Sequence, residues 1–297
     1  MTRIKKIAIL VHEHDRRAQR FPYIAWLLQR EWESYGIEVE LLRGTGKVVD
    51  ADILFPQIDL SVVPDAYLRY FENYPKVVNR NVTDIRKSSF SSLRVEPGDG
   101  WDGPVILKSN LNYGGFPEVR LGSVFGRIRL LASKIIAPIR RVSSGEETGK
   151  STNLRFEDPI NPHDYPVFDR ASDVPEEVYR HPNLIVDRFL QEPSGQGYIL
   201  RSYNFLGNRG FTRRRVSSDP IVKASNSRLI DSPPLPRELV EFRNQLGFDY
   251  GKIDYLEHDG QPVPLDINTT PTIAKGSDQG SLLRDLRELA RGIEDIA

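Results

Sequence analysis

The sequence has no cysteine, one methionine and five histidines among its 297 residues. Without cysteine, the protein cannot form disulfides, use a thiolate nucleophile, or hold iron–sulfur clusters or cysteine-ligated zinc. Five histidines argue against a histidine-rich metal site. No stretch reaches the roughly 18 to 20 apolar residues that a membrane span requires. Neither sign of charge is in excess, since 41 Lys and Arg balance 41 Asp and Glu, which argues against a nucleic acid as partner.

Apolar residues are plentiful enough for a sizeable buried core. They make up 39% of the sequence and include 13 Phe, 12 Tyr and 3 Trp. The N-terminus has basic residues and a short apolar run, but acidic residues follow at once and no small-residue cleavage pattern appears. We therefore expect the first strand of a cytoplasmic protein here, and no signal peptide.

The first 80 residues alternate between strand-like and helix-like patterns. Residues 5–12 form an apolar run typical of a buried strand, and residues 22–35 have the spacing of an amphipathic helix that ends at Gly36. Further strands are predicted at 37–42, 53–58 and 76–79. This order predicts a small open parallel sheet with helices.

Beyond residue 95 the predicted elements become shorter and more mixed. Residues 104–118 predict a strand that runs into a glycine-containing loop, residues 121–141 a helix, and residues 143–173 a long polar loop or insertion. Strands are predicted at 184–189, 198–206, 210–215, 250–257 and 262–267, helices at 236–246 and 281–296, and a turn at 258–260. The last helix carries one apolar face, formed by Leu282, Leu283, Leu286, Leu289, Ala290 and Ile293.

Residues 250–271 carry the most informative polar pattern. Asp254 lies on one predicted strand, and Asp266 and Asn268 lie two residues apart on the next, so alternation allows the three side chains to converge. Two carboxylates and a carboxamide oxygen suit Mg²⁺, which keeps waters and phosphate oxygens as its other ligands. The alternative is that these acids serve turn chemistry and solubility. That alternative explains Asp259, but polar residues on both sides of a buried strand position are costly without a role.

The order Lys-x-Asp, a turn, then Asp-x-Asn-x-x-Pro resembles the C-terminal signature of the ATP-grasp superfamily. The resemblance is to its carboxylate–amine ligases, such as D-alanine–D-alanine ligase, the ribosomal-protein glutamate ligases and glutathione synthetase. It implies that Asp254, Asp266 and Asn268 hold one or two Mg²⁺ ions on ATP and that Lys252 lies near the transferred phosphate. The second acid is commonly Glu in this family, so the shorter Asp266 is expected to hold a second metal less firmly.

The resemblance also assigns residues to nucleotide binding. Lys108, Gly114 and Gly115 resemble the lysine and flexible glycine loop that close over the phosphates, and Lys87, or nearly as well Arg86, resembles a second phosphate-contacting base on a helix. The strand at 184–190 resembles the one that borders adenine. The residues expected beside the base are Asp187, Arg188, Phe189 and Leu190, with Glu192 near the ribose. Without the family, the lysine and glycines indicate an exposed turn, and Asp187 with Arg188 a surface ion pair.

Arginines cluster between residues 201 and 223, where six basic residues face one acid, Asp219. The resemblance implies that Arg201 and Arg213 or Arg215 project toward the acyl substrate and the γ-phosphate, since guanidinium groups bind such anions in bidentate fashion. Strand alternation separates Arg213 and Arg215 from Arg214, so one set can face the site while the other faces water. A solvated surface or an RNA-binding surface is the alternative.

Two other regions are open to more than one interpretation. Residues 121–141 carry five basic residues and no acid beside an apolar stripe. They fit a core-packed helix with snorkelling arginines, or a basic amphipathic helix for a membrane surface or an acidic partner. His12, His14 and Asp59 follow predicted strands at the edge where open α/β sheets bind ligands. They are candidates for substrate contact or for capping the next helix.

Together these features predict an α/β protein with an ATP-grasp fold. Its expected parts are an N-terminal Rossmann-like domain (1–88), a lid subdomain (89–195, with an insertion at about 121–175) and a C-terminal ATP- and Mg²⁺-binding subdomain (196–297), the last two enclosing ATP. The implied reaction activates a carboxylate as an acyl phosphate for attack by an amine. Small-molecule or peptide substrates are the expected partners, and a homodimer is allowed. A kinase-like phosphotransferase and a non-catalytic nucleotide-binding protein remain as alternatives.

Overall fold

The computed structural model describes residues 4–16, 18–122, 160–273 and 279–296. Contacts divide the chain into unit 1, residues 1–85 with 191–297, and unit 2, residues 86–190. These boundaries lie close to the predicted ones near 88 and 195. The N-terminal and C-terminal parts belong to one unit because they share a hydrophobic core. The helix predicted at 121–141 and most of the predicted insertion lie outside the described residues.

The N-terminal part of unit 1 is a three-stranded parallel sheet in the order β2-β1-β3. Its strands are Lys6–Val11 (β1), Glu38–Arg43 (β2) and Ile53–Gln57 (β3), and its helices are Ile24–Ser34 (α1) and Asp65–Phe71 (α2). Helix α1 buries Ile24, Leu28 and Trp32 at four-residue spacing. The strand predicted at 76–79 is a single bridge from Val77 to Leu54, because the backbone turns into the left-handed region at Asn79, with a φ of 58°.

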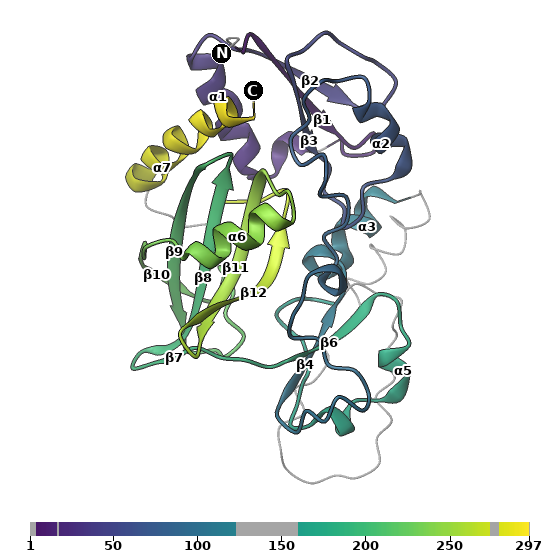
Figure 1. The fold of residues 1–297 in the computed structure, drawn as a ribbon, viewed down its shortest axis with the longest axis vertical. Coiled ribbons are helices and arrows are strands. Elements are labelled where there is room, and N and C mark those ends of the chain that lie inside the picture. The colour runs from purple at the N-terminus through teal and green to yellow at the C-terminus, as the bar shows by residue number, and fades with distance from the viewer. Residues whose placement is uncertain (1–3, 17, 123–159, 274–278, 297) are drawn as a thin grey trace. The chain divides into compact units, whose positions relative to one another are not determined.

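The C-terminal part of unit 1 is an antiparallel sheet in the order β10-β9-β8-β11-β12, with β7 paired to β8 (Figure 1). Its strands are Pro193–Ser194 (β7), Gly197–Leu206 (β8), Arg209–Ser217 (β9), Arg228–Asp231 (β10), Tyr250–His258 (β11) and Gln261–Asn268 (β12). Asp259 and Gly260 both have positive φ, which suits the two-residue turn between β11 and β12. Helix α6 (Arg237–Gln245) covers one face of the sheet, where Arg243 lies over the ring of Phe205.

Helix α7 (Gln279–Arg291) lies beside α1 and continues into a 3₁₀ turn, Gly292–Asp295 (Figure 1). The Nε1 of Trp32 donates a hydrogen bond of 2.9 Å to the carbonyl oxygen of Ala290. Burying a large apolar side chain such as Leu286 or Leu289 stabilises the fold by about 1.5–3 kcal/mol. Leu283 was predicted on the buried face but is 47% exposed. On the helix surface, Leu283 lies beside the apolar stripe of Leu286 and Leu289, on the side that faces solvent.

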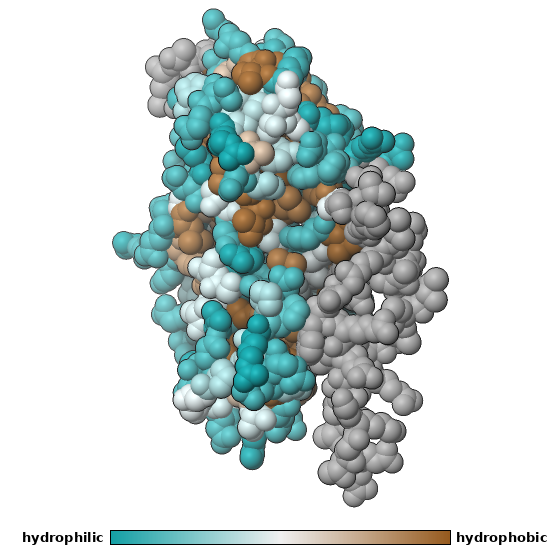
Figure 2. All heavy atoms as spheres, turned by 90° about the vertical axis from the view of Figure 1, so that its right-hand side faces the viewer, coloured by the Kyte–Doolittle hydropathy of each residue, from teal (hydrophilic) through white to brown (hydrophobic). Residues whose placement is uncertain are grey.

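Unit 2 is built on a three-stranded sheet in the order β5-β4-β6. Its strands are Val105–Ser109 (β4), Val167–Phe168 (β5) and Leu184–Arg188 (β6), and its helices are Phe116–Leu121 (α3) and Glu176–Tyr179 (α5). Its core includes Val105, Leu107 and Val186. In neither unit does any described helix have the length and apolarity that crossing a membrane requires. The face shown in Figure 2 is mainly hydrophilic, with hydrophobic residues in small groups.

The side chain of Asn79 joins the two parts of unit 1. Its Oδ1 accepts the N–H groups of Asp249 and Tyr250, both at 2.9 Å, and its Nδ2 donates to the carbonyl oxygen of Tyr250 at 2.7 Å. Its backbone N–H donates to the Asp249 carboxylate at 2.8 Å. Burial raises the pKa of Asp249, although the Asn79 hydrogen bond and Arg243 oppose that rise. The N-terminal part is therefore fixed to the start of β11.

The raised pKa of Asp249 predicts a pH effect on stability. Because the folded state holds this proton more tightly than the unfolded state, the contribution is full below the unfolded pKa of about 3.9 and is lost as the pH rises through the folded pKa. We expect Asp249→Asn, which keeps an acceptor oxygen, to gain stability relative to the unmodified chain as the pH rises. Urea unfolding of both proteins between pH 4 and pH 8 tests this. A difference in stability that is constant across that range would contradict it.

Candidate active site on the large sheet

The predicted metal ligands lie on one face of the β11–β12 hairpin. Asp254 pairs directly with Asp266, and Lys252 pairs directly with Asn268, so the four side chains share a face. The register shifts by one residue just beyond Asp254, where β12 carries Pro264 as an edge strand can. The shared face expected from strand alternation is therefore present.

The acidic pair on the β11–β12 hairpin favours a cation. Two carboxylates that face each other across a strand pair repel unless positive charge lies between them. The Lys252 Nζ lies 2.7 Å from Asp254 Oδ2. Burial opposes the charge of Lys252, but Asp254 and more weakly Asp266 outweigh it, so the pKa of Lys252 is raised. The lysine ammonium thus partly neutralises an acidic pair whose oxygens are of the type that Mg²⁺ binds.

This set of donors fits a metal that is bound partly by the protein and partly by a phosphate. Within the described ranges, no three His, Cys, Asp or Glu side chains are grouped as a metal site. Asp254 and Asp266 are two carboxylates, so Asn268 would supply the third protein ligand. An Mg²⁺ ion usually keeps waters and substrate phosphate oxygens beside one or two carboxylates. The residues present match that kind of shared site.

Two arginines of β9 share this face. Asp254 pairs with Ser202 on β8, Ser202 pairs with Arg213 on β9, and Arg215 lies two residues further along. Burial and the nearby Arg213 lower the pKa of Arg215, while Asp254 opposes that change. Among the described residues, the Arg215 guanidinium has no hydrogen bond or ion pair. It is a partly buried cation that Asp254 attracts without forming an ion pair.

Arg213, in contrast, is already engaged. Its guanidinium pairs with Asp285 of α7 and donates to the Ser232 hydroxyl at 2.7 Å. A pocket of about 350 Å³ lies beside this pair and includes Leu235 and Arg284 in its lining. Of the two arginines predicted on this face, Arg215 is the better placed to receive an anionic substrate.

Arg201 does not join this group, contrary to its predicted role. It pairs with Arg214 across β8 and β9, so both lie on the opposite face of the sheet. The Arg201 guanidinium is buried between Glu192, with nitrogen–oxygen distances of 2.6–3.2 Å, and Glu257 at 2.7 Å. Glu192 also accepts the backbone N–H of Glu257, so its carboxylate is engaged here rather than exposed for a ribose. We therefore leave Arg201 out of the candidate site.

In unit 2, Lys108 and Asp187 form a buried ion pair. The Lys108 Nζ lies 2.5 Å from Asp187 Oδ2, and the Ser91 hydroxyl donates to Asp187 Oδ1 at 3.1 Å. The surface pair between Asp187 and Arg188 is therefore wrong as an alternative. Arg188 instead lies over the Trp101 ring, with its Cζ 4.8 Å from the ring centroid. Lys108 is held in one orientation near the end of β4.

The backbone beyond Asp187 presents no spare donors in this region. The N–H of Arg188 donates to Leu93, that of Phe189 to Pro104, and that of Leu190 to Arg188. If this segment borders adenine, its contribution must come from carbonyl oxygens, which can accept from the exocyclic amino group.

The remaining predicted phosphate contacts lie in two separate 3₁₀ turns. Lys87 is in a 3₁₀ turn, Lys87–Ser89, and donates to the carbonyl oxygen of Leu111 at 3.1 Å. Gly114 and Gly115 have φ values of 70° and 85°, and Gly115 is the N-cap of α3. A Cβ on Gly114 would lie 2.0 Å from the Ile160 carbonyl oxygen, so the absence of a side chain permits a close approach of two backbone segments.

Of the candidate residues at the carboxyl end of the N-terminal sheet, His12 is buried, Asp59 is partly buried and His14 is exposed. The His12 ring is buried and stacks on Tyr67, and its Nδ1 accepts the N–H of His14. Asp59 accepts hydrogen bonds from Tyr23 and Thr270. The sequence reading missed Gln57, whose buried amide has no hydrogen-bond partner in the described part of the chain. The sequence feature that points to Gln57 is a carboxamide at the end of an otherwise apolar strand.

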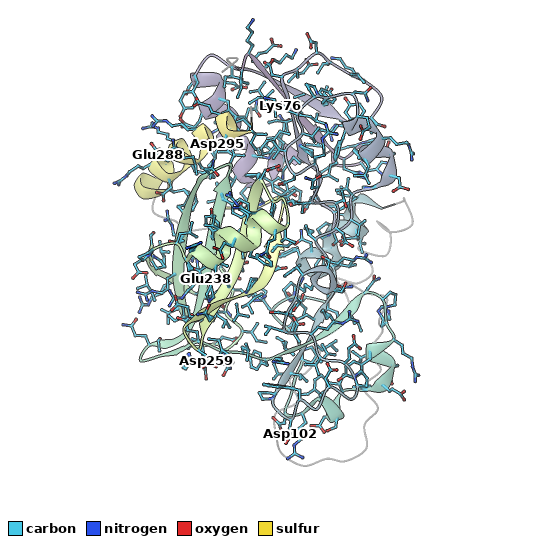
Figure 3. The ribbon with its side chains drawn as sticks, in the orientation of Figure 1. Lys76, Asp102, Glu238, Asp259, Glu288 and Asp295 are labelled. Atoms are coloured by element: carbon cyan, nitrogen blue, oxygen red, sulfur yellow. The ribbon has the colours of Figure 1, made fainter. Side chains whose placement is uncertain are left out.

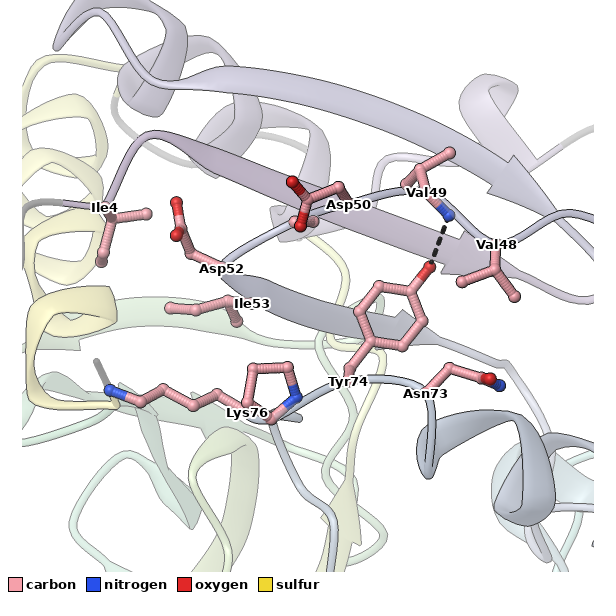
Figure 4. A pocket seen from close by; sticks show the side chains of 11 residues that line it. Ile4, Val48, Val49, Asp50, Asp52, Ile53, Asn73, Tyr74 and Lys76 are labelled. Atoms are coloured by element: carbon pink, nitrogen blue, oxygen red, sulfur yellow. Dashed lines mark hydrogen bonds between the residues drawn. The ribbon is translucent and has the colours of Figure 1, made fainter.

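A pocket of about 580 Å³ lies at the other end of that sheet (Figure 4). Asp50, Asp52 and Lys76 line it with Tyr74, whose hydroxyl accepts the N–H of Val49. Asp52 is engaged there, because its carboxylate accepts the N–H groups of Lys5 and Lys6. No residue of the polar face on β11 and β12 lines this pocket.

Comparison with solved structures identifies the architecture. The chain is similar to a RimK domain ATP-grasp protein from Sphaerobacter thermophilus. The match covers 98% of each chain, with a TM-score of 0.50 and 13% sequence identity. The chain has the ATP-grasp fold. Two structures of D-alanine–D-alanine ligase from Bacillus anthracis, one complexed with ATP, cover 98% of this ATP-grasp chain and 97% of theirs, with TM-scores of 0.48 and 0.46 and 11% identity. No family model and no curated protein sequence matches it.

Proposed function

We propose that this ATP-grasp chain is an ATP- and Mg²⁺-dependent ligase that joins a carboxylate to an amine. The carrying observation is the placement of Asp254, Asp266 and Asn268 on the same sheet face as Arg215. A bound metal–nucleotide needs carboxylates to bind its cation and a desolvated guanidinium to bind its anionic phosphates. The position of these residues in an ATP-grasp fold supports the same reaction.

In the proposed reaction, a carboxylate oxygen of the first substrate attacks the γ-phosphorus of ATP and ADP leaves. The amine nitrogen then attacks the acyl carbon, a proton is lost from nitrogen, and phosphate leaves with the electrons of the carbon–oxygen bond. Bound Mg²⁺ would neutralise phosphate charge. Arg215 would donate to the transferring phosphoryl group, whose negative charge is spread over its oxygens.

Other residues would position and neutralise the reactants. Lys252 keeps the acidic pair from repelling before nucleotide binds, and Lys108 and Lys87 would offer ammonium groups to the phosphates. We propose Gly114 and Gly115, and the backbone of residues 187–190, for the nucleotide on the basis of the resemblance alone. No nucleophile or general base from the protein is required.

An ADP-release screen tests the function. Purified protein with MgATP is presented with carboxylates and amines, singly and in pairs, and ADP and the coupled product are measured. We expect turnover that requires both substrates. ADP release with a carboxylate or hydroxyl compound but no amine would favour a phosphotransferase instead, and nucleotide binding without turnover across the screen would favour a non-catalytic role.

Arg215 and Arg214 provide a matched pair of variants on one strand. We expect Arg215→Met to lower ATP turnover by about a hundredfold or more, because it removes a cation from the metal-bearing face. Arg214→Met removes the same charge from the opposite face, where Arg214 pairs with Asp231, and should leave turnover nearly unchanged. Steady-state ADP release measures both. Equal losses in the two variants would contradict the assignment of Arg215.

A further inference from the structure

The loop after β12 links the candidate metal ligand Asn268 to the N-terminal part of unit 1. The backbone N–H of Thr270 donates to Asn268 Oδ1 at 2.8 Å. The buried hydroxyl of Thr270 lies 2.8 Å from Asp59 Oδ1 and 3.1 Å from Asn268 Oδ1. Asp59 follows β3, and Asn268 ends β12, so one hydroxyl lies between a carboxylate of the first sheet and a carboxamide of the second.

The Thr270 hydroxyl has a single proton and two acceptors within reach. A hydroxyl donates one hydrogen bond, and an ionised carboxylate is a stronger acceptor than a neutral amide. The contact to Asp59 is also the shorter of the two. The Thr270 hydroxyl therefore donates to Asp59. The Asn268 oxygen has two lone pairs, and the Thr270 N–H uses one of them, which leaves the other for a cation.

The Asp59 carboxylate is held in place by its surroundings. Its Oδ2 accepts the Tyr23 hydroxyl at 2.7 Å. Two backbone hydrogen bonds of 2.9 Å, from Ile24 to Pro271 and from Ile273 to Pro22, tie the loop after β12 to the start of α1. Asp59 and Thr270 are thus fixed relative to each other.

We infer that Asp59 is a positioning residue for the metal ligand Asn268. Because Asp59 accepts the hydrogen bond of the Thr270 hydroxyl, that hydroxyl does not donate to the second lone pair of the Asn268 oxygen. Without Asp59, the hydroxyl turns to Asn268 and competes with the metal. This inference rests on the proposed function, because it takes Asn268 to be an Mg²⁺ ligand.

The test is a double-mutant cycle on Mn²⁺ affinity in the presence of a non-hydrolysable ATP analogue, followed by the electron paramagnetic resonance of free Mn²⁺. We expect Asp59→Ala to weaken Mn²⁺ binding by about tenfold, as loss of an outer-shell partner commonly does. Thr270→Val removes the competing hydroxyl and should leave affinity close to that of the unmodified chain. The double variant should regain the affinity of Thr270→Val, because no hydroxyl remains to compete.

The outcomes separate this role from a structural one. If Asp59 only supports the loop, the double variant will bind Mn²⁺ at least as weakly as Asp59→Ala, and the inference is overturned. An unchanged affinity in Asp59→Ala overturns it as well. Asp50→Ala, an exposed acid before β3, is the matched control, and thermal unfolding checks that each variant folds. If the unmodified chain binds no Mn²⁺ with the analogue, the proposed function itself fails.

Discussion

Replacing Asp266 or Asn268 by alanine is expected to reduce Mg²⁺-dependent ATP turnover by at least about a hundredfold, the size of effect seen when one transition-state contact is removed. Both residues lie on the edge strand β12 and face Asp254 and Lys252. In Asp266→Ala, Lys252 keeps its ion pair with Asp254, whose Oδ2 lies 2.7 Å from Nζ. ADP release as a function of Mg²⁺ concentration is the measurement.

Asp259→Asn is the control for loss of negative charge in the same hairpin. Asp259 lies at the tip of the β11–β12 turn, with its side chain 91% exposed (Figure 3). Asparagine tolerates the positive φ of this position, so the turn should persist. Turnover in Asp259→Asn should match the unmodified chain. Unchanged turnover in both Asp266→Ala and Asn268→Ala would remove the basis of the site.

Asn79→Ala should destabilise unit 1 more than any surface substitution. It leaves the partly buried N–H of Asp249, the buried N–H of Tyr250 and the carbonyl oxygen of Tyr250 without the Asn79 side chain as partner. Each such group costs about 1–3 kcal/mol, so we expect a loss of about 3 kcal/mol or more. Alanine also fits the left-handed backbone at this position less well than asparagine. Urea denaturation measures the change in the free energy of unfolding.

Asn73→Ala is the matched control for Asn79→Ala. The exposed Asn73 side chain donates one hydrogen bond, to the carbonyl oxygen of Tyr70 at 2.8 Å, at the end of α2. Water can replace that bond, so its loss should change stability by less than about 0.5 kcal/mol. Similar losses in the two variants would show that the Asn79 contacts do not hold the two parts of unit 1 together.

Much of the site could be predicted because its geometry is local. Strand alternation requires only the residues of one hairpin, and it placed Asp254, Asp266 and Asn268 on a common face. The same alternation separated Arg215 from Arg214 on β9. The apolar spacing of α1 likewise follows from neighbours within three turns of helix.

The partners of charged side chains could not be predicted, because they are set by contacts between distant segments. Arg201 binds Glu257, 56 residues away, and Arg213 binds Asp285, 72 residues away. The sequence shows these arginines as a cluster of equal charges. Strand pairing places Arg201 inside the fold, where Glu192 and Glu257 neutralise it, and Arg215 on the face of Asp254. The register of β8, β9 and β11 decides on which face each arginine lies.

The chain enters and leaves unit 2 once, so unit 1 is made of two segments separated by about a hundred residues of intervening sequence. During synthesis, residues 1–85 emerge first. Asn79 can form its hydrogen bond only after Tyr250 is made, and Trp32 only after Ala290 is made, and these bonds complete the shared core. Unit 2, being continuous, can acquire its structure on the ribosome before unit 1 does. Nascent chains halted before α7 should thus expose the apolar side of α1.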